Sequence, residues 1–355
     1  MLVGLALTAV THVFGHGWTS DFSNLAFTAA LFLVLFGVMM WCAFGVVRHA
    51  EALAHYSGEP YGTLILTLSA VCIEVTIMAT VMLTGDPNPT LPRDTVYAVT
   101  MIVLNAMIGI SIVVGALRHR QQQYSLQGAV AFLAVITCLA VISLIIPTFT
   151  TSTPDSSVTT MQALAIASLT AALYIGFLMI QTMRHRTFFI EAVDADGEPK
   201  ERGPDYPVWV HAILLLLTLL PVVLLAESLA LILDFALDKL HAPATIGGII
   251  IAILVLSPEG LSSFRAASRN HLQRSVNLSL GSALSTIGLT IPVMLVISQF
   301  TGTPLQLGLP PADAVLLGLT LVIAQMTFSG APTNILLGGV HLVIFATFVM
   351  LIFSP

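Results

Sequence analysis

The sequence predicts an all-α polytopic membrane protein of about eleven transmembrane helices, with one extra N-terminal helix followed by two five-helix repeats of inverted topology. Three observations predict this class. Of the 355 residues, 57% are hydrophobic and 8% are charged, whereas soluble domains carry about 25% charged residues. Apolar stretches of about 20 residues, the length that crosses a bilayer, recur along the chain. Two of these stretches hold a glutamate at matched places, Glu74 and Glu259.

Each predicted helix is an apolar stretch bounded by polar, glycine or proline residues. The first stretch is short, but no Lys or Arg precedes it and no small-residue cleavage site follows it, so we expect a helix rather than a signal peptide. The eleven predicted ranges are 2–14, 25–47, 62–84, 95–117, 126–148, 160–182, 207–235, 243–264, 275–300, 312–330 and 333–353.

The positions of Lys and Arg predict the orientation, because cytoplasmic loops are enriched in them. Loops after even-numbered helices hold ten of these twelve residues, and loops after odd-numbered helices hold only Arg93 and Lys239. We therefore expect the N-terminus in the cytoplasm and the C-terminus outside.

The two halves of the chain resemble each other locally. Ala50–Ala54 (AEALA) is similar to Ala226–Ala230 (AESLA), and Glu74 and Glu259 each follow a glycine by twelve residues. Chance is the alternative account of such short matches. Five helices per unit is an odd number, so the second unit enters the membrane from the opposite side. The predicted organisation is a first helix and loop (1–24), a five-helix repeat (25–182), an acidic cytoplasmic linker (183–206) and a second five-helix repeat (207–355).

The two glutamates are the candidate ion site. A carboxylate at membrane depth costs about 2.5–3.5 kcal/mol on insertion scales, so its presence suggests a function. In inverted repeats the ion site is expected near the midplane, where the repeats meet. The alternative is a protonated acid that is hydrogen-bonded to a neighbouring helix for structural reasons. Two acids at matched places favour a shared site for cations and protons.

Several polar residues near the glutamates are candidates to support the ion path. Thr67 shares a helical face with Glu74, and Ser257 precedes Pro258, which removes the helical partner of the Leu254 carbonyl and is expected to kink the helix beside Glu259.

The predicted helix 275–300 carries two stripes of small or polar residues. Asn277 and Ser282 are its candidate ion-path residues, and Asn105 is the counterpart in helix 95–117. The alternative reading is close helix packing through small residues, which is common in membranes. The stripes are Asn277, Gly281, Ser285 and Gly288, and Ser275, Ser279, Ser282 and Thr286.

Three further residues are candidates for gating or proton relay. Glu51 and Glu227 occupy matched places in the two halves, although Glu51 lies near a helix end where water can solvate it. His341 in the last helix is either a proton carrier or a buried histidine with satisfied hydrogen bonds, and the second reading is favoured. The acidic run from Glu191 to Asp205 holds six of the eighteen acids but lacks the ligand register of a calcium loop, so a solvated linker is expected.

At these residues the chain resembles a known family. The segments Gly58–Ser69, Ser257–Leu261 and Gln273–Leu278 are similar to signature segments of bacterial calcium/proton antiporters of the ChaA group, in the calcium:cation antiporter superfamily. The resemblance implies an antiporter with one essential glutamate per repeat, matching Glu74 and Glu259. The proton-coupled exchangers of the superfamily usually carry Asn three residues before each acid, where this chain has Val71 and Leu256, so its cation ligands are expected to differ.

The resulting expectation is a secondary active transporter that exchanges Ca²⁺ for protons by alternating access, without a cofactor. Its partners are the transported ions and the lipid bilayer, and no nucleic acid. The alternatives are a Na⁺ or K⁺/proton antiporter of the same fold and, less favoured, a cation channel. An intramembrane enzyme is disfavoured, because the chain has no His-Glu-x-x-His or Gly-x-Ser-Gly motif.

Overall fold

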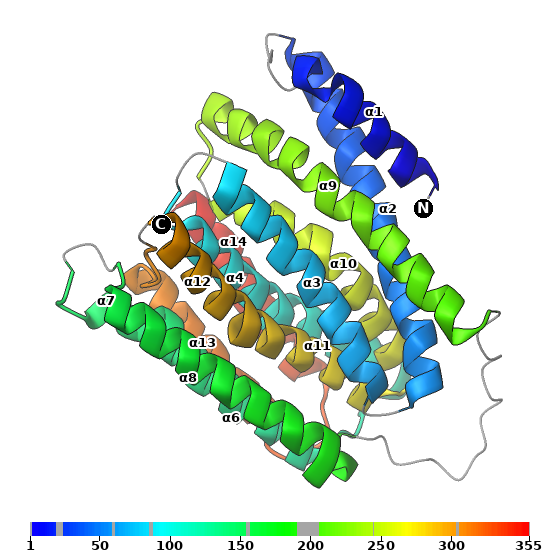
Figure 1. The fold of residues 1–355 in the computed structure, drawn as a ribbon. Helices are drawn as coiled ribbons and strands as arrows, with labels where there is room; N and C mark the ends of the chain where they lie inside the picture. The colour runs from blue at the N-terminus through cyan, green and yellow to red at the C-terminus, as the bar shows by residue number, and fades with distance from the viewer. Residues whose placement is uncertain are drawn as a thin grey trace.

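The computed structural model describes residues 2–18, 24–58, 61–84, 88–153, 157–189, 206–243, 245–302 and 305–354. In these ranges every regular element is a helix, and the helices pack into a bundle (Figure 1). Most of the expected acidic linker, residues 190–205, lies outside the described residues.

The first half of the chain supplies one flank and part of the centre of the bundle. Its α-helices are α1 (Leu2–Trp18), α2 (Leu25–Ser57), α3 (Tyr61–Thr84), α4 (Leu91–Met101), α5 (Ile108–His119), α6 (Leu126–Ala140), α7 (Ile146–Phe149) and α8 (Thr160–Met179). Short π-helices η1 (Ile102–Met107), η2 (Val141–Ile145) and η3 (Ile180–Arg184) and the 3₁₀-helix η4 (Arg186–Phe188) join or end them.

The second half completes the bundle. Its helices are α9 (Val208–Leu240), α10 (Thr245–Ser268), α11 (Leu272–Ser285), the π-helix η5 (Thr286–Thr290), α12 (Ile291–Thr301), α13 (Pro311–Thr327) and α14 (Ile335–Phe353). Side-chain caps start several helices: Asn24 accepts from the Phe27 amide, and Asn334 accepts from the amides of Leu336 and Leu337.

Helical residues cover the predicted ranges, and two helices run well past them. Helix α2 continues ten residues beyond the predicted end at 47 and stops at Gly58, whose φ of 66° suits glycine. Helix α9 continues to Leu240 and ends at His241, which has a left-handed φ of 50°. Hydrophobic length predicts the part of a helix that crosses lipid, and polar residues can extend that helix into water.

Helix α10 continues as an α-helix through Pro258, and a kink of its axis there stays a prediction. The α4–α5 and α11–α12 helices each contain a π-helical segment, η1 and η5. A π-segment widens the turn and is frequent at functional sites.

The helices have the lengths and composition of an integral membrane protein. The described residues hold eight helices long and apolar enough to cross a bilayer, and three shorter apolar helices at Leu2–Thr11, Thr67–Thr80 and Pro311–Thr327. The apolar windows within Leu91–His119 and Leu272–Thr301 are 83% and 78% buried, against 28–56% for the other six. The helices that contain η1 and η5 therefore form the centre of the bundle.

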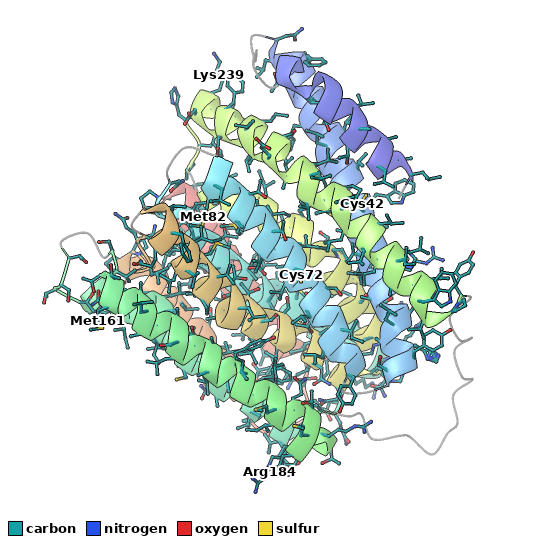
Figure 2. The ribbon with its side chains drawn as sticks, viewed as in Figure 1. Cys42, Cys72, Met82, Met161, Arg184 and Lys239 are labelled. Atoms are coloured by element: carbon teal, nitrogen blue, oxygen red, sulfur yellow. The ribbon has the colours of Figure 1, made fainter. Side chains whose placement is uncertain are left out.

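Contacts between the halves occur at both ends of the bundle. At one end Arg93 donates to the Gly308 carbonyl at 2.8 Å. At the other end Gln122 donates to the Ala267 carbonyl at 2.8 Å. Figure 2 places Lys239 and Arg184 at opposite ends.

Helices α5 and α14 cross closely through glycines, which gives a stability prediction. A Cβ at Gly338 lies 2.9 Å from the Gly109 carbonyl oxygen and 2.8 Å from Val113 Cγ2, whereas a Cβ at Gly339 meets nothing within 4 Å. We expect Gly338→Ala to lower the unfolding free energy by about 1–3 kcal/mol through overpacking.

Gly339→Ala is the matched control, since it adds the same methyl group to the same helix. Thermal unfolding in detergent compares the two variants. A melting temperature of the Gly338→Ala protein equal to or above that of the Gly339→Ala protein contradicts the close crossing of α5 and α14.

Candidate ion-binding site

Both glutamates are buried in the centre of the bundle. Glu74 in α3 is 2% exposed and Glu259 in α10 is 1% exposed. The two carboxyl groups are near enough to interact electrostatically. Among the described residues no basic side chain acts on either glutamate. Two buried acids without a basic partner are suited to bind cations or protons.

Glu74 is held by two threonines from the other half of the chain. Thr286 donates to Glu74 Oε2 at 2.7 Å, and Thr290 donates to Glu74 Oε1 at 3.1 Å. These threonines begin and end η5 and are themselves buried. The π-helical segment therefore presents two hydroxyl donors to one carboxyl group.

Glu259 is less completely satisfied than Glu74. Ser282 of α11 is the neighbouring hydroxyl group that acts on its carboxyl group. Glu259 Oε2 is buried and has no hydrogen-bond partner. A buried polar atom without a partner is costly, so it marks a position where a ligand can bind.

One helical turn from Glu259, four buried serines form a hydroxyl cluster. Ser263 Oγ lies 2.7 Å from Ser275 Oγ, 3.1 Å from Ser279 Oγ and 3.1 Å from Ser111 Oγ. The cluster joins α5, α10 and α11. It shows that the Ser275–Ser279 side of the second stripe supports polar packing between helices.

Asn105 and His341 lie in one buried network. Asn105 donates to Thr320 Oγ1 at 3.0 Å, and its amide oxygen lies 3.2 Å from His341 Nδ1. His341 Nε2 lies 3.0 Å from Thr327 Oγ1. The structure thus joins Asn105 to α13 and α14, and both ring nitrogens of His341 have partners.

The other predicted ion-path residues have separate surroundings. Asn277 donates to the Phe189 carbonyl at 2.6 Å, and Ser257 donates to the Ile253 carbonyl of its own helix. Thr67 is buried next to Gly281 of α11. A Cβ added to that glycine would lie 3.6 Å from the Thr67 hydroxyl oxygen. The structure therefore groups Ser282 with the glutamates and places Asn277 and Ser257 in other contacts.

Glu51 and Glu227 differ from each other in their surroundings. Glu51 is partly exposed and accepts a hydrogen bond from Ser262 of α10 at 2.9 Å. Glu227 is exposed on α9. Glu51 thus connects α2 to the helix that carries Glu259.

Comparison with known proteins shows the family of this chain. The sequence profile of the family described as "Sodium/calcium exchanger protein" matches residues 27–183 and 210–354. The chain belongs to this exchanger family. The two matched segments correspond to the two halves of the bundle, and each contains one of the buried glutamates.

The sequence of this exchanger is similar to those of several bacterial proteins. It is 42% identical over 330 residues to "Putative ionic transporter y4hA" of Sinorhizobium fredii, covering 92% of this chain and 90% of that protein. It is 39% identical over 342 residues to "Sodium-potassium/proton antiporter ChaA" of Escherichia coli, covering 95% and 92%. Its fold is similar to the structure of native YfkE, with a TM-score of 0.77 and 17% identity, covering 100% of this chain and 98% of that chain.

Two pockets lie next to α3, the helix that carries Glu74. One pocket lies between α3, α9 and α10, and reaches Ile77, one turn beyond Glu74. Asp234 and Asn88 supply its polar lining. The other lies between α3, α6, α8 and α11 and includes Thr67 and Gln181. Thr67 lies two turns before Glu74 and Ile77 one turn after it, so the two pockets adjoin α3 at places before and after that residue.

The threonine contacts of Glu74 can be tested by a double-mutant cycle. Thr286→Val removes a hydroxyl donor from a buried carboxyl group at constant size. We expect it to lower the unfolding free energy by about 1–3 kcal/mol. In a Glu74→Leu background the same substitution is expected to have little effect, because its partner is gone.

Unfolding in mixed detergents measures all four proteins of this cycle. Thr301→Val is the control, since Thr301 is exposed near the end of α12 and bonds only backbone carbonyls of its own helix. An equal cost of Thr286→Val with and without Glu74 contradicts the assigned bond.

Proposed function

We propose that this exchanger is a cation/proton antiporter in which Glu74 and Glu259 bind the cation or protons in alternation. The observation that carries the proposal is the pair of interacting, fully buried carboxyl groups, one from each half and neither with a basic partner among the described residues. The names of its relatives support it, since the E. coli protein is described as a sodium-potassium/proton antiporter.

The chemistry of the site supports competition between cations and protons. Hard cations such as Ca²⁺ prefer oxygen ligands, and the site offers two carboxyl groups with the hydroxyls of Ser282, Thr286 and Thr290. Without a cation, burial and like charge both favour protonation of such carboxyl groups. Because the same oxygens serve both ligands, movement of one ion is coupled to movement of the other.

The proposed architecture is an eleven-span protein with two inverted five-helix repeats, 25–182 and 207–355, and a linker at 183–206. The π-segments support it. Segment η1 begins 28 residues after Glu74 and η5 begins 27 residues after Glu259. The distribution of Lys and Arg supports a cytoplasmic N-terminus and an external C-terminus. The bacterial relatives support location in a bacterial inner membrane.

Ca²⁺ is the proposed cation, because two ionised carboxylates carry a charge of −2 that suits a divalent ion. Na⁺ or K⁺ is the second candidate, favoured by the name of the E. coli relative. Of the supporting residues, Ser282 is the one that acts directly on a glutamate, Glu259. Asn105, Asn277, Thr67 and Ser257 are proposed only to line the path.

The surroundings of Glu51, His341 and Glu227 support a different role for each. Glu51 can respond to movement of α10 through Ser262. His341 is proposed to position Asn105 rather than to carry protons, since both ring nitrogens have partners. Glu227 has an exposed position, which suits contact with water or lipid headgroups more than a place in the site.

Glutamine substitutions test the proposal. Glu74→Gln and Glu259→Gln keep the size of the side chain and remove the negative charge, so each is expected to reduce cation-driven proton movement in everted vesicles at least about 100-fold, close to background. Asp238→Asn, at an exposed position near the end of α9, is the control. Substantial exchange by either glutamine variant contradicts the shared site.

The same vesicles distinguish the candidate cations. Ca²⁺, Na⁺ and K⁺ are added separately, and proton movement is followed with a pH-sensitive dye. Coupled movement with Ca²⁺ supports the divalent assignment, and a response only to Na⁺ or K⁺ replaces it. Cation conduction without proton movement indicates a channel and contradicts antiport.

A further inference from the structure

A pair of histidines joins the two halves of the protein away from the glutamates. His49 lies near the end of α2 and His211 near the start of α9. Their Nδ1 atoms are 3.1 Å apart, and the ring centroids are 5.3 Å apart. The Lys and Arg distribution predicts that this end of the bundle faces the cytoplasm.

The pair belongs to a long contact between α2 and α9, which lie side by side (Figure 1). Near the histidines the helices approach closely, and a Cβ at Gly45 would lie 3.3 Å from Thr218 Cγ2. Tyr56 of α2 also donates to the Tyr206 carbonyl at 2.8 Å. Farther along, most buried residues of these helices are apolar, as Leu35 and Leu225 are. The histidine link lies at one end of this contact.

The environment of His211 determines which nitrogen donates. His211 is 6% exposed, and its Nε2 is buried without a hydrogen-bond partner. A buried N–H without an acceptor is rare in proteins. The neutral ring is therefore best accommodated with its proton on Nδ1, which donates to Nδ1 of the partly exposed His49.

A proton added to this pair disrupts it. His49 Nδ1 is the acceptor, so its protonation places two N–H groups against each other. The bond can re-form only if His211 moves its own proton to Nε2, where the N–H has no acceptor. Among the described residues, the groups whose charge acts on His49 are His211 and Arg48, and both are positive when protonated. The ring of Tyr206 packs against His211, and the nearby Glu51 is bonded to Ser262.

We propose that His49 and His211 form a second proton-binding site, separate from the glutamates, that joins the halves at this end of the bundle until it takes up a proton. Histidine ordinarily changes charge near pH 6.5, and burial together with positive neighbours lowers the pKa of His49 below that value. Acidification on this side is then expected to release the ends of α2 and α9. The consequence for transport rests on the proposed alternating access, which requires the halves to move relative to each other.

Hydrogen exchange measures the link directly, without requiring transport. Backbone amides in 46–57 and 208–216 are compared at pH 5.5 and 7.5 in the full-length protein, after correction for intrinsic rates. In the wild type we expect protection to fall about fivefold at the lower pH, the effect of losing one hydrogen bond. His49→Gln can still accept from His211 but cannot take up a proton in this range, so its protection is expected to be independent of pH.

His55→Gln is the matched control, because His55 is exposed on the same helix and its described ring contact is with the neighbouring Tyr56. It is expected to behave as the wild type. His211→Leu provides a second variant, with low protection at both pH values. Unchanged protection in the wild type, or a wild-type pH response in His49→Gln, overturns the proposal. If the wild-type protein shows the expected pH response in hydrogen exchange but no cation/proton antiport, only the proposed function is overturned.

Discussion

The structure depends on the burial of two carboxyl groups at the centre of a membrane-spanning bundle. Each carboxyl group needs polar partners, and the chain provides hydroxyl groups rather than basic side chains. Thr286 and Thr290 reach Glu74 from the other half, and Ser282 reaches Glu259. A basic partner would neutralise the site permanently, whereas hydroxyl groups can donate to an ionised carboxylate and accept from a protonated one. The site can therefore hold either a cation or protons.

The two carboxyl groups are not equivalent, although they occupy matched places in the sequence. Both oxygens of Glu74 accept hydrogen bonds, while Glu259 Oε2 has none. In an inverted repeat, the two halves must differ in conformation for the site to open to one side at a time. Such a difference is expected to give each glutamate a different set of partners. On this account, the better-satisfied glutamate exchanges roles with the other during transport.

The sequence predicted the class of fold and the central residues because both follow from the membrane. Apolar length predicts spans, and an acid inside a span is conspicuous. The ends of α2 and α9 were not predictable from apolar length, since these helices extend past the apolar stretch until Gly58 and His241. The π-segments were also missed, because no residue type specifies them. For the same reason Thr290 was overlooked, since its contact with Glu74 depends on η5. The bonds of Asn277 to the Phe189 carbonyl and of Ser257 to its own helix were not predictable from the sequence, because they depend on how neighbouring backbone segments pack.

The central claim is that cation and protons compete for the same two carboxyl groups. The most direct measurement is the number of protons released per cation bound by the purified protein, obtained from calorimetric titrations in two buffers of different ionisation enthalpy. The account predicts net proton release in the wild type near neutral pH and none in the Glu74→Gln/Glu259→Gln double variant. Cation binding by the wild type without proton release, or equal release by the double variant, would contradict it.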